Sequence, residues 1–205
     1  MSDVQPFWEA GYQDQDAETF GSPSEELVVL ADTLAPDTVV LDVGCGDGRN
    51  AIHFASRGFR VRAFDISATG VRKLKARAGS RDLEIDAWVQ DIREFKFDRS
   101  YGLILCHGVL HFLEPRFCNQ FLEVMRRHTA QCGLNVHTVF TNRLKPPSDL
   151  TPFLQRIFKE GEIRDMYRDW EIELFESYIK VDEHPGGIRH RHPINKLVAR
   201  KPCDG

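Results

Sequence analysis

An acid followed by glycines at every second position is the part of this sequence best suited to holding a small ligand. The segment is Asp42-Val43-Gly44-Cys45-Gly46-Asp47-Gly48. Glycine tolerates positive φ and has no Cβ, so a ligand can lie directly on the backbone. The apolar run before the segment, residues 39–43, predicts a buried strand, and a helix is expected to begin near Arg49. A strand, a glycine turn and a helix in this order bind nucleotide-like cofactors in open α/β sheets.

The spacing of the glycines distinguishes between cofactors. The dinucleotide fingerprint G-x-G-x-x-G would need its third glycine at position 49, where this chain has Arg49. The pattern D-x-G-x-G-x-G instead resembles motif I of the class I S-adenosylmethionine (SAM) methyltransferases. SAM carries no pyrophosphate, so the loop does not need to aim amides at phosphates. It has to fit a methionine tail and a ribose, with Asp42 near the ammonium group.

The ends of three later strands agree with this resemblance. A strand over residues 59–65 ends in Asp65, which can accept hydrogen bonds from both ribose hydroxyls. The resemblance assigns the two residues after the next strand, 83–90, to the adenine amino group and ring edge. A strand over 101–106 should end beside the sulfonium. The expected cofactor-binding residues are therefore Asp42, Gly44, Cys45, Gly46, Asp65, Ile66, Asp91, Ile92, Cys106 and His107.

Histidines and arginines crowd together near the C-terminal end, over residues 182–193. In an extended segment, Arg189 and Arg191 share one face while His190 and His192 share the other. Three interpretations stay open at this point. The segment is a solvated connection, a metal site built on His-x-His, or a site that recognises an anionic or soft substrate.

The C-terminal third narrows the resemblance to one family. Residues 158–170 and 197–201 resemble the tail of tellurite-resistance protein B-like methyltransferases, and the similarity runs from about residue 38 to 201. In that family a His-Arg pair and a later arginine are proposed to act on the substrate. The resemblance therefore implies His184 and Arg189 as catalytic residues. No metal ligand is expected, because few further ligands lie near His190 and His192 in the sequence. The chain departs from the family pattern at Pro185, which stands where the paired arginine would be.

Composition bounds the class of protein. The chain has 205 residues, of which 41% are hydrophobic and 28% charged, as in an ordinary globular domain. A net charge of −4 gives no bulk attraction to nucleic acid or to an anionic membrane. The sequence shows neither an apolar run of roughly 20 residues nor a signal-peptide pattern, so we expect a cytoplasmic protein. Its five cysteines are scattered without a C-x-x-C pair, which predicts free thiols.

The elements that must position these residues alternate from residue 38 to 141, which predicts a parallel sheet wrapped on both faces. We expect one α/β domain: a Rossmann-like, doubly wound, seven-stranded sheet with an antiparallel C-terminal hairpin. The fifth strand is expected over residues 134–141, a helix over 158–170, and the hairpin strands over 171–178 and 194–201. Residues 1–37 are predicted to form an N-terminal lid and helix, and 38–205 the methyltransferase domain.

The function predicted from these observations is transfer of a methyl group from SAM to a small-molecule acceptor, either a tellurite- or selenite-type oxyanion or a thiol. His184, His107 or His111 could act as a base for a harder nucleophile. Three alternatives stay open: an NAD-type oxidoreductase, a nucleic-acid methyltransferase and a non-catalytic binding module. Arg49 disfavours the first, and the pI near 6.1 disfavours the second. Neither a nucleic-acid partner nor a membrane partner is expected, and the oligomeric state is not predicted.

Overall fold

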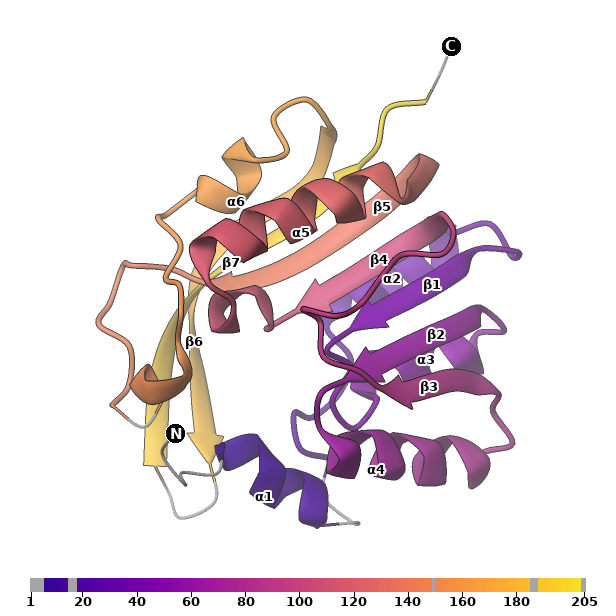
Figure 1. Cartoon of the computed structure of the whole chain (residues 1–205), viewed down its shortest axis with the longest axis horizontal. Coiled ribbons are helices and arrows are strands. Elements are labelled where there is room, and N and C mark those ends of the chain that lie inside the picture. Colours follow the sequence, from indigo (N-terminus) through magenta and orange to yellow (C-terminus); the bar gives the residue numbers. More distant parts are fainter. Residues whose placement is uncertain (1–5, 15–17, 149, 185–187, 204–205) are drawn as a thin grey trace. The chain divides into compact units, whose positions relative to one another are not determined.

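A computed structural model of the chain describes the backbone of residues 6–14, 18–148, 150–184 and 188–203 (Figure 1). It describes the side chains of these residues except 7, 182–184 and 188–190. The chain divides into two compact units, residues 1–96 and 97–205, called here the first and the second unit. Within the described residues, the helices are all too short or too polar to cross a membrane.

A seven-stranded mixed sheet has the order β3-β2-β1-β4-β5-β7-β6. Its strands are β1 (Val39–Val43), β2 (Arg60–Asp65), β3 (Ile85–Val89), β4 (Tyr101–His107), β5 (Thr129–Phe140), β6 (Glu171–His184) and β7 (Ile188–Arg200). β2 pairs in parallel with β1 and β3, and β4 pairs in parallel with β5. β7 is antiparallel to both β5 and β6. The predicted fold class, a parallel sheet closed by an antiparallel hairpin, is confirmed.

Helices follow the strands, as the alternating pattern predicts. The described helices are α1 (Phe7–Gln13), α2 (Glu25–Thr33), α3 (Arg49–Ser56), α4 (Ala68–Gly79), α5 (Pro115–Arg127) and α6 (Glu162–Asp165), with 3-10 turns η1 (Leu110–Phe112) and η2 (Thr151–Phe153). Ser67 caps α4, because its side chain accepts a hydrogen bond from the Gly70 amide. In the second unit, α5 lies over β5 with its apolar stripe buried (Figure 1).

Several predicted element boundaries were wrong. β5 begins at Thr129, whereas the strand was expected to begin at residue 134. Of the helix expected over 158–170, only α6 and the turns after it form. Phe158 is instead bridged to Thr141, and Gly161 adopts a left-handed conformation that starts α6 late. The hairpin strands β6 and β7 are longer than expected, so most of the histidine- and arginine-rich segment is strand.

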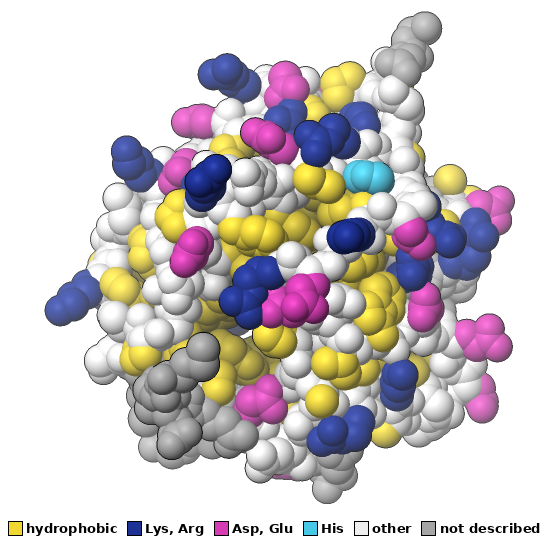
Figure 2. Space-filling model, in the orientation of Figure 1, with side chains coloured by type: hydrophobic (Ala, Val, Ile, Leu, Met, Phe, Trp, Pro, Cys, Tyr) yellow, Lys and Arg dark blue, Asp and Glu magenta, His cyan; other side chains and the backbone are white. Residues whose placement is uncertain are grey.

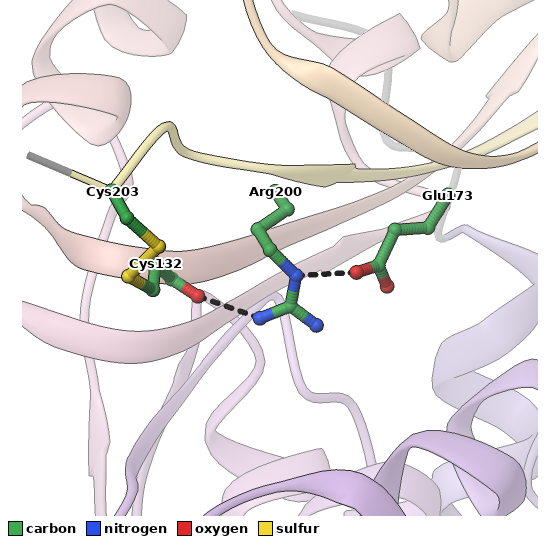
Figure 3. Close-up of a disulfide and its surroundings, with 4 residues drawn as sticks. All are labelled: Cys132, Glu173, Arg200 and Cys203. Carbon is green, nitrogen blue, oxygen red and sulfur yellow. Dashed lines mark hydrogen bonds and ion pairs between the residues drawn. A yellow bond between two sulfur atoms is a disulfide. The ribbon is translucent and has the colours of Figure 1, made fainter. Parts of the chain in front are cut away.

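A disulfide joins Cys132 to Cys203, so the prediction of free thiols was wrong for this pair (Figure 3). The Lys201 amide donates a 2.8 Å hydrogen bond to the Gly133 carbonyl, which holds the C-terminal segment beside the start of β5. Cys132 and Cys203 are 71 residues apart in the sequence, and their spacing carries no sign of this contact. The free cysteines of the described chain are the buried Cys45, Cys106 and Cys118.

Arg200 holds the same region through polar contacts. Its Nη1 donates a 2.7 Å hydrogen bond to the Cys132 carbonyl, and its Nε pairs with the carboxylate of Glu173 (Figure 3). The C-terminal end of β7 is therefore tied to both neighbouring strands of the hairpin sheet.

Candidate functional site

The glycine loop after β1 is bound to the end of β2 by backbone amides. Gly44 and Cys45 both donate to the Phe64 carbonyl, at 2.9 and 3.0 Å. The Gly46 amide donates to Oδ2 of Asp65 at 2.8 Å. Gly44 and Gly46 have φ of +69° and +55°, which side chains with a Cβ rarely adopt. The alternating glycines therefore let consecutive amides turn toward β2.

Asp65 lies at the end of β2, as predicted, and its carboxylate is buried and oriented. Oδ1 accepts a 2.8 Å hydrogen bond from the Ser67 amide, while Oδ2 accepts the Gly46 amide. Burial raises the pKa of Asp65, and these two amides oppose the shift. An ionised carboxylate has about four acceptor sites, so it can still accept two hydroxyl donors. This is the capacity that recognition of a ribose requires.

Asp42, at the end of β1, has a buried carboxylate oxygen that is available to accept a hydrogen bond. The side chain is only 2% exposed, and the amide of Ala51 in the first turn of α3 donates to it. Its Oδ2 has no hydrogen-bond partner among the described residues. Burial raises the pKa of Asp42 to about 7, although Arg49 lowers it. An ammonium group placed here would satisfy the bare oxygen and favour the ionised acid.

Exposed apolar side chains stand at the adjacent ends of β2 and β3. Ile66 is 62% exposed and Val89 51% exposed, and Val89 is paired in register with Asp65. Such a surface suits a planar ring. Asp91, predicted to contact the adenine amino group, already accepts hydrogen bonds from the Arg93 amide and guanidinium, which lower its pKa. Ile92 is half-buried beside it.

These features of the first unit fit SAM better than a dinucleotide. The loop has glycines where the backbone turns. Asp42 has an oxygen without a hydrogen-bond partner among the described residues, which suits an ammonium group. The Asp65 carboxylate is oriented by backbone amides, which suits a ribose. At the position of the missing third glycine, the Arg49 guanidinium donates to the Phe20 carbonyl at 2.9 Å. The Arg49 side chain therefore binds the segment before α2, in the same unit.

In the second unit, the end of β4 lies beside a buried polar network. Asn135 Nδ2 donates to Thr129 Oγ1 and to the Leu134 carbonyl, so Asn135 Oδ1 accepts from the Tyr167 hydroxyl at 2.9 Å. Tyr167 has one proton to give, so its oxygen accepts from Nε2 of His137 at 2.7 Å. Burial lowers the pKa of His137 to about 3, which keeps the ring neutral and its Nδ1 unprotonated.

His111, one of the candidate bases, packs in the core. Its ring stacks on Phe140 at a centroid distance of 4.0 Å, and His192 stacks on the same phenyl ring at 4.8 Å. Burial lowers the pKa of His111 to about 3, helped by His192 and His107. His111 is therefore a neutral packing residue. Of the two expected cofactor residues here, Cys106 is buried and His107 half-buried.

The predicted catalytic residues lie near the tip of the hairpin. In backbone register, His184 pairs with Ile188 and Glu183 pairs with Arg189. The side chains of His184, Arg189 and His190 lie outside the described residues. Farther along β7, Arg191 is exposed and His192 is buried, as the predicted alternation requires. Among the described side chains, no group of three or more His, Cys, Asp or Glu is placed to hold a metal ion.

A buried ion pair in the first unit has no clear signal in the sequence. Asp47, inside the glycine loop, lies with its Oδ2 3.2 Å from the ammonium of Lys73 on α4, and both side chains are almost fully buried. Lys73 stands between Val71 and Leu74 on the buried side of the helix, where a lysine is uncommon. That position in the apolar pattern is the one hint that the sequence offers.

Comparisons with known proteins agree with this geometry. The family described as "Tellurite resistance protein TehB" matches residues 12–190. Hemagglutinin 1 of Eikenella corrodens is 31% identical over 174 residues, covering 83% of this chain and 56% of that protein. A Haemophilus influenzae protein named "Probable S-adenosyl-L-methionine-dependent methyltransferase TehB" is 28% identical over 180 residues, covering 86% and 61%.

Solved structures give the same fold. The crystal structure of TehB from Haemophilus influenzae matches with a TM-score of 0.78 at 23% identity, over 87% of this chain and 62% of that one. The chain thus spans about three fifths of the length of the relatives it matches.

Proposed function

Because this chain belongs to the tellurite resistance protein TehB family, we propose that it transfers a methyl group from SAM to a small-molecule acceptor. The observation that carries the proposal is the hydrogen bond from the Gly46 amide to the Asp65 carboxylate. It joins the glycine loop to the acid that would hold the ribose. The bare oxygen of Asp42 supports the same cofactor, because the methionine tail offers an ammonium group.

The residues proposed to hold the cofactor are those expected from the sequence. Asp42 would bind the ammonium, Asp65 the ribose hydroxyls, and the exposed Ile66 one face of the adenine. The other members of the proposed set are Gly44, Cys45, Gly46, Asp91, Ile92, Cys106 and His107. When bound, SAM supplies a methyl group activated by its sulfonium sulfur.

The protein's own part in such a reaction is alignment and exclusion of water. We propose soft nucleophiles as acceptors, either a tellurite- or selenite-type oxyanion or a thiol, since they need little help from a base. His184 and Arg189 are proposed to act on the acceptor. Both residues lie within two register pairs of the tip of the hairpin. An arginine fork suits an oxyanion.

Calorimetric titration tests the cofactor. We expect SAM to bind and NADH not to bind, and binding of NADH alone would overturn the proposal. A screen with methyl-labelled SAM against tellurite, selenite, thiols and small amines then tests the acceptor. Transfer only to amines would contradict the soft-nucleophile assignment. Transfer only to nucleic acid would favour the alternative, although acidic and basic side chains are intermingled on the face that Figure 2 shows.

A cytoplasmic location remains a prediction. In a reducing compartment the bond between Cys132 and Cys203 would be expected to open. The redox state of this pair in the cell therefore reports on the location as well as on the fold.

A further inference from the structure

Tyr12, at the C-terminal end of α1, packs directly on the glycine loop. The side chain is 4% exposed. A Cβ added to Gly46 would lie 2.6 Å from the Tyr12 hydroxyl oxygen, and one added to Gly70 would lie 3.2 Å from its Cε2. Phe20 packs against the ring at a centroid distance of 6.1 Å. The missing side chain at position 46 therefore makes room for a tyrosine hydroxyl as well as for a ligand.

The buried Asp47–Lys73 pair anchors the chain just before Tyr12. The Lys73 ammonium donates to the Gly11 carbonyl at 3.0 Å and to Thr19 Oγ1 at 3.2 Å, in addition to its 3.2 Å contact with Asp47. A buried ammonium is stable only when its donors are satisfied. Two of its three partners come from the N-terminal segment, so the pair and the docked segment depend on each other.

The chain after Tyr12 is held to the same loop. Thr19 donates to Asp47 Oδ2 from its hydroxyl at 2.9 Å and from its amide at 3.3 Å. Arg77 on α4 pairs with Asp47 at 3.3 Å and with Glu18 at 3.2 Å. Tyr12 is therefore fixed from both sides, which is more than a loosely packed tail requires.

The Tyr12 hydroxyl is a hydrogen-bond donor that lies beside Gly46 of the glycine loop. Burial raises its pKa, and the carboxylates of Asp65 and Asp47 raise it further, so it stays protonated. Cys45 lies within electrostatic reach of both Asp42 and Tyr12. The acid proposed for the ammonium and this hydroxyl thus both lie near Cys45 of the loop.

We propose that Tyr12 belongs to the cofactor site and that its hydroxyl donates a hydrogen bond to the carboxylate of the cofactor's methionine portion. The Asp47–Lys73 pair acts through it as a positioning device. An amino-acid tail carries an ammonium and a carboxylate on one carbon, so a site with Asp42 for the first needs a donor for the second. The inference rests on the proposed function, because it assumes that SAM is the cofactor.

The test compares two ligands that differ only in the amino-acid tail. S-adenosylhomocysteine has the carboxylate, and 5′-methylthioadenosine lacks the tail. For Tyr12→Phe we expect calorimetry to show S-adenosylhomocysteine binding weakened on the order of tenfold and methylthioadenosine binding unchanged. Equal affinity of Tyr12→Phe and wild type for S-adenosylhomocysteine overturns the inference. If wild type binds neither ligand, the proposed function itself fails, so the two failures are distinguishable.

The anchor is tested by a double-mutant cycle. Lys73→Met is compared with Lys75→Met, which changes an exposed lysine on the same helix. We expect Lys73→Met to weaken S-adenosylhomocysteine binding and to leave little further effect for Tyr12→Phe, since a displaced tyrosine cannot donate. Thr19→Val serves as a milder variant if thermal unfolding shows that Lys73→Met is poorly folded. If Tyr12→Phe weakens S-adenosylhomocysteine binding by the same factor in the Lys73→Met protein as in the Lys75→Met protein, the anchoring role is overturned.

Discussion

The backbone amide of Gly46 donates a 2.8 Å hydrogen bond to Oδ2 of Asp65. Together with the bonds from Gly44 and Cys45 to the Phe64 carbonyl, this contact connects the loop after β1 with the end of β2, so the two parts of the proposed cofactor site are held together. It also places a fixed dipole on the carboxylate, which partly offsets the cost of burying it. A Cβ added to the same loop residue would lie 2.6 Å from the Tyr12 hydroxyl oxygen.

Asp65→Ala should weaken SAM binding by at least about tenfold, because the acceptor for the ribose is lost and the Gly46 amide is left without its partner. Calorimetry with SAM measures the effect. Asp86→Ala is the matched control, since Asp86 is an exposed acid on the next strand that pairs with Arg62. Unchanged SAM affinity in Asp65→Ala would remove Asp65 from the site.

Gly46→Ala should destabilise the protein by roughly 1–3 kcal/mol, because the position has φ +55° and the new Cβ would meet the Tyr12 hydroxyl. Urea unfolding measures the loss. Gly79→Ala is the control, since a Cβ there meets nothing within 4 Å. In a Tyr12→Ala background, Gly46→Ala should cost less, because the steric part of the loss is absent and only the backbone strain remains. An equal cost in both backgrounds would show that the tyrosine does not constrain the glycine.

The site residues that the sequence predicts best are the polar side chains that stand at the ends of predicted strands. Asp42 and Asp65 could be placed because an apolar run that ends in an acid marks both the strand and the edge of the sheet where ligands bind. The antiparallel hairpin was also expected, although not its length. The strands continue because β6 and β7 pair with each other up to their tip, a contact that no local pattern reveals.

Contacts between segments far apart in the chain account for what the sequence could not predict. Cys132 and Cys203 meet because β7 returns beside the start of β5. The docking of Tyr12 depends on Lys73, 61 residues further along, and on the path of α4. An aromatic residue near an N-terminus is compatible with many arrangements. This contact was not predicted from the sequence, and the one feature compatible with it is that Lys73 interrupts an otherwise apolar face of α4.

The pH dependence of cofactor binding should follow Asp42. Burial raises its pKa from 3.8 to about 7 in the folded protein. Between these values the folded protein holds a proton that the unfolded chain releases. The free energy of unfolding contributed by Asp42 is therefore present below pH 4 and is lost as pH rises through about 7, by at most about 1.4 kcal/mol per unit.

A bound ammonium group would lower the pKa of Asp42 again, because the positive charge favours the ionised carboxylate. SAM should bind with release of a proton near pH 6, and its affinity should rise between about pH 5 and pH 8. Calorimetry in two buffers of different ionisation enthalpy measures the proton release. Asp42→Asn should bind SAM weakly and without this pH dependence. A wild-type affinity that is flat over the range would contradict the placement of Asp42 beside the ammonium.

Thiol titration of the denatured chain should find three reactive thiols without reductant and five with it, given one disulfide among five cysteines. Cys203→Ser should lower the free energy of unfolding by up to roughly 4 kcal/mol under oxidising conditions, because the bond closes a long loop in the unfolded chain. With reductant, wild type and variant should unfold together. Five reactive thiols from the outset would mean that the pair is reduced.

His184→Ala and Arg189→Ala should each lower turnover with the true acceptor by about 10- to 100-fold, while SAM affinity stays close to that of wild type. The reason is that Asp42 and Asp65, proposed to bind the ammonium and the ribose of the cofactor, lie in the first unit, whereas His184 and Arg189 lie on the hairpin of the second. Arg191→Ala is the matched control, because Arg191 is exposed on the same strand two residues further along. Steady-state kinetics with the acceptor found in the methyl-transfer screen, together with calorimetry, separates the two effects. If both variants turn over as wild type does, the hairpin is a solvated connection and acceptor recognition belongs to other residues.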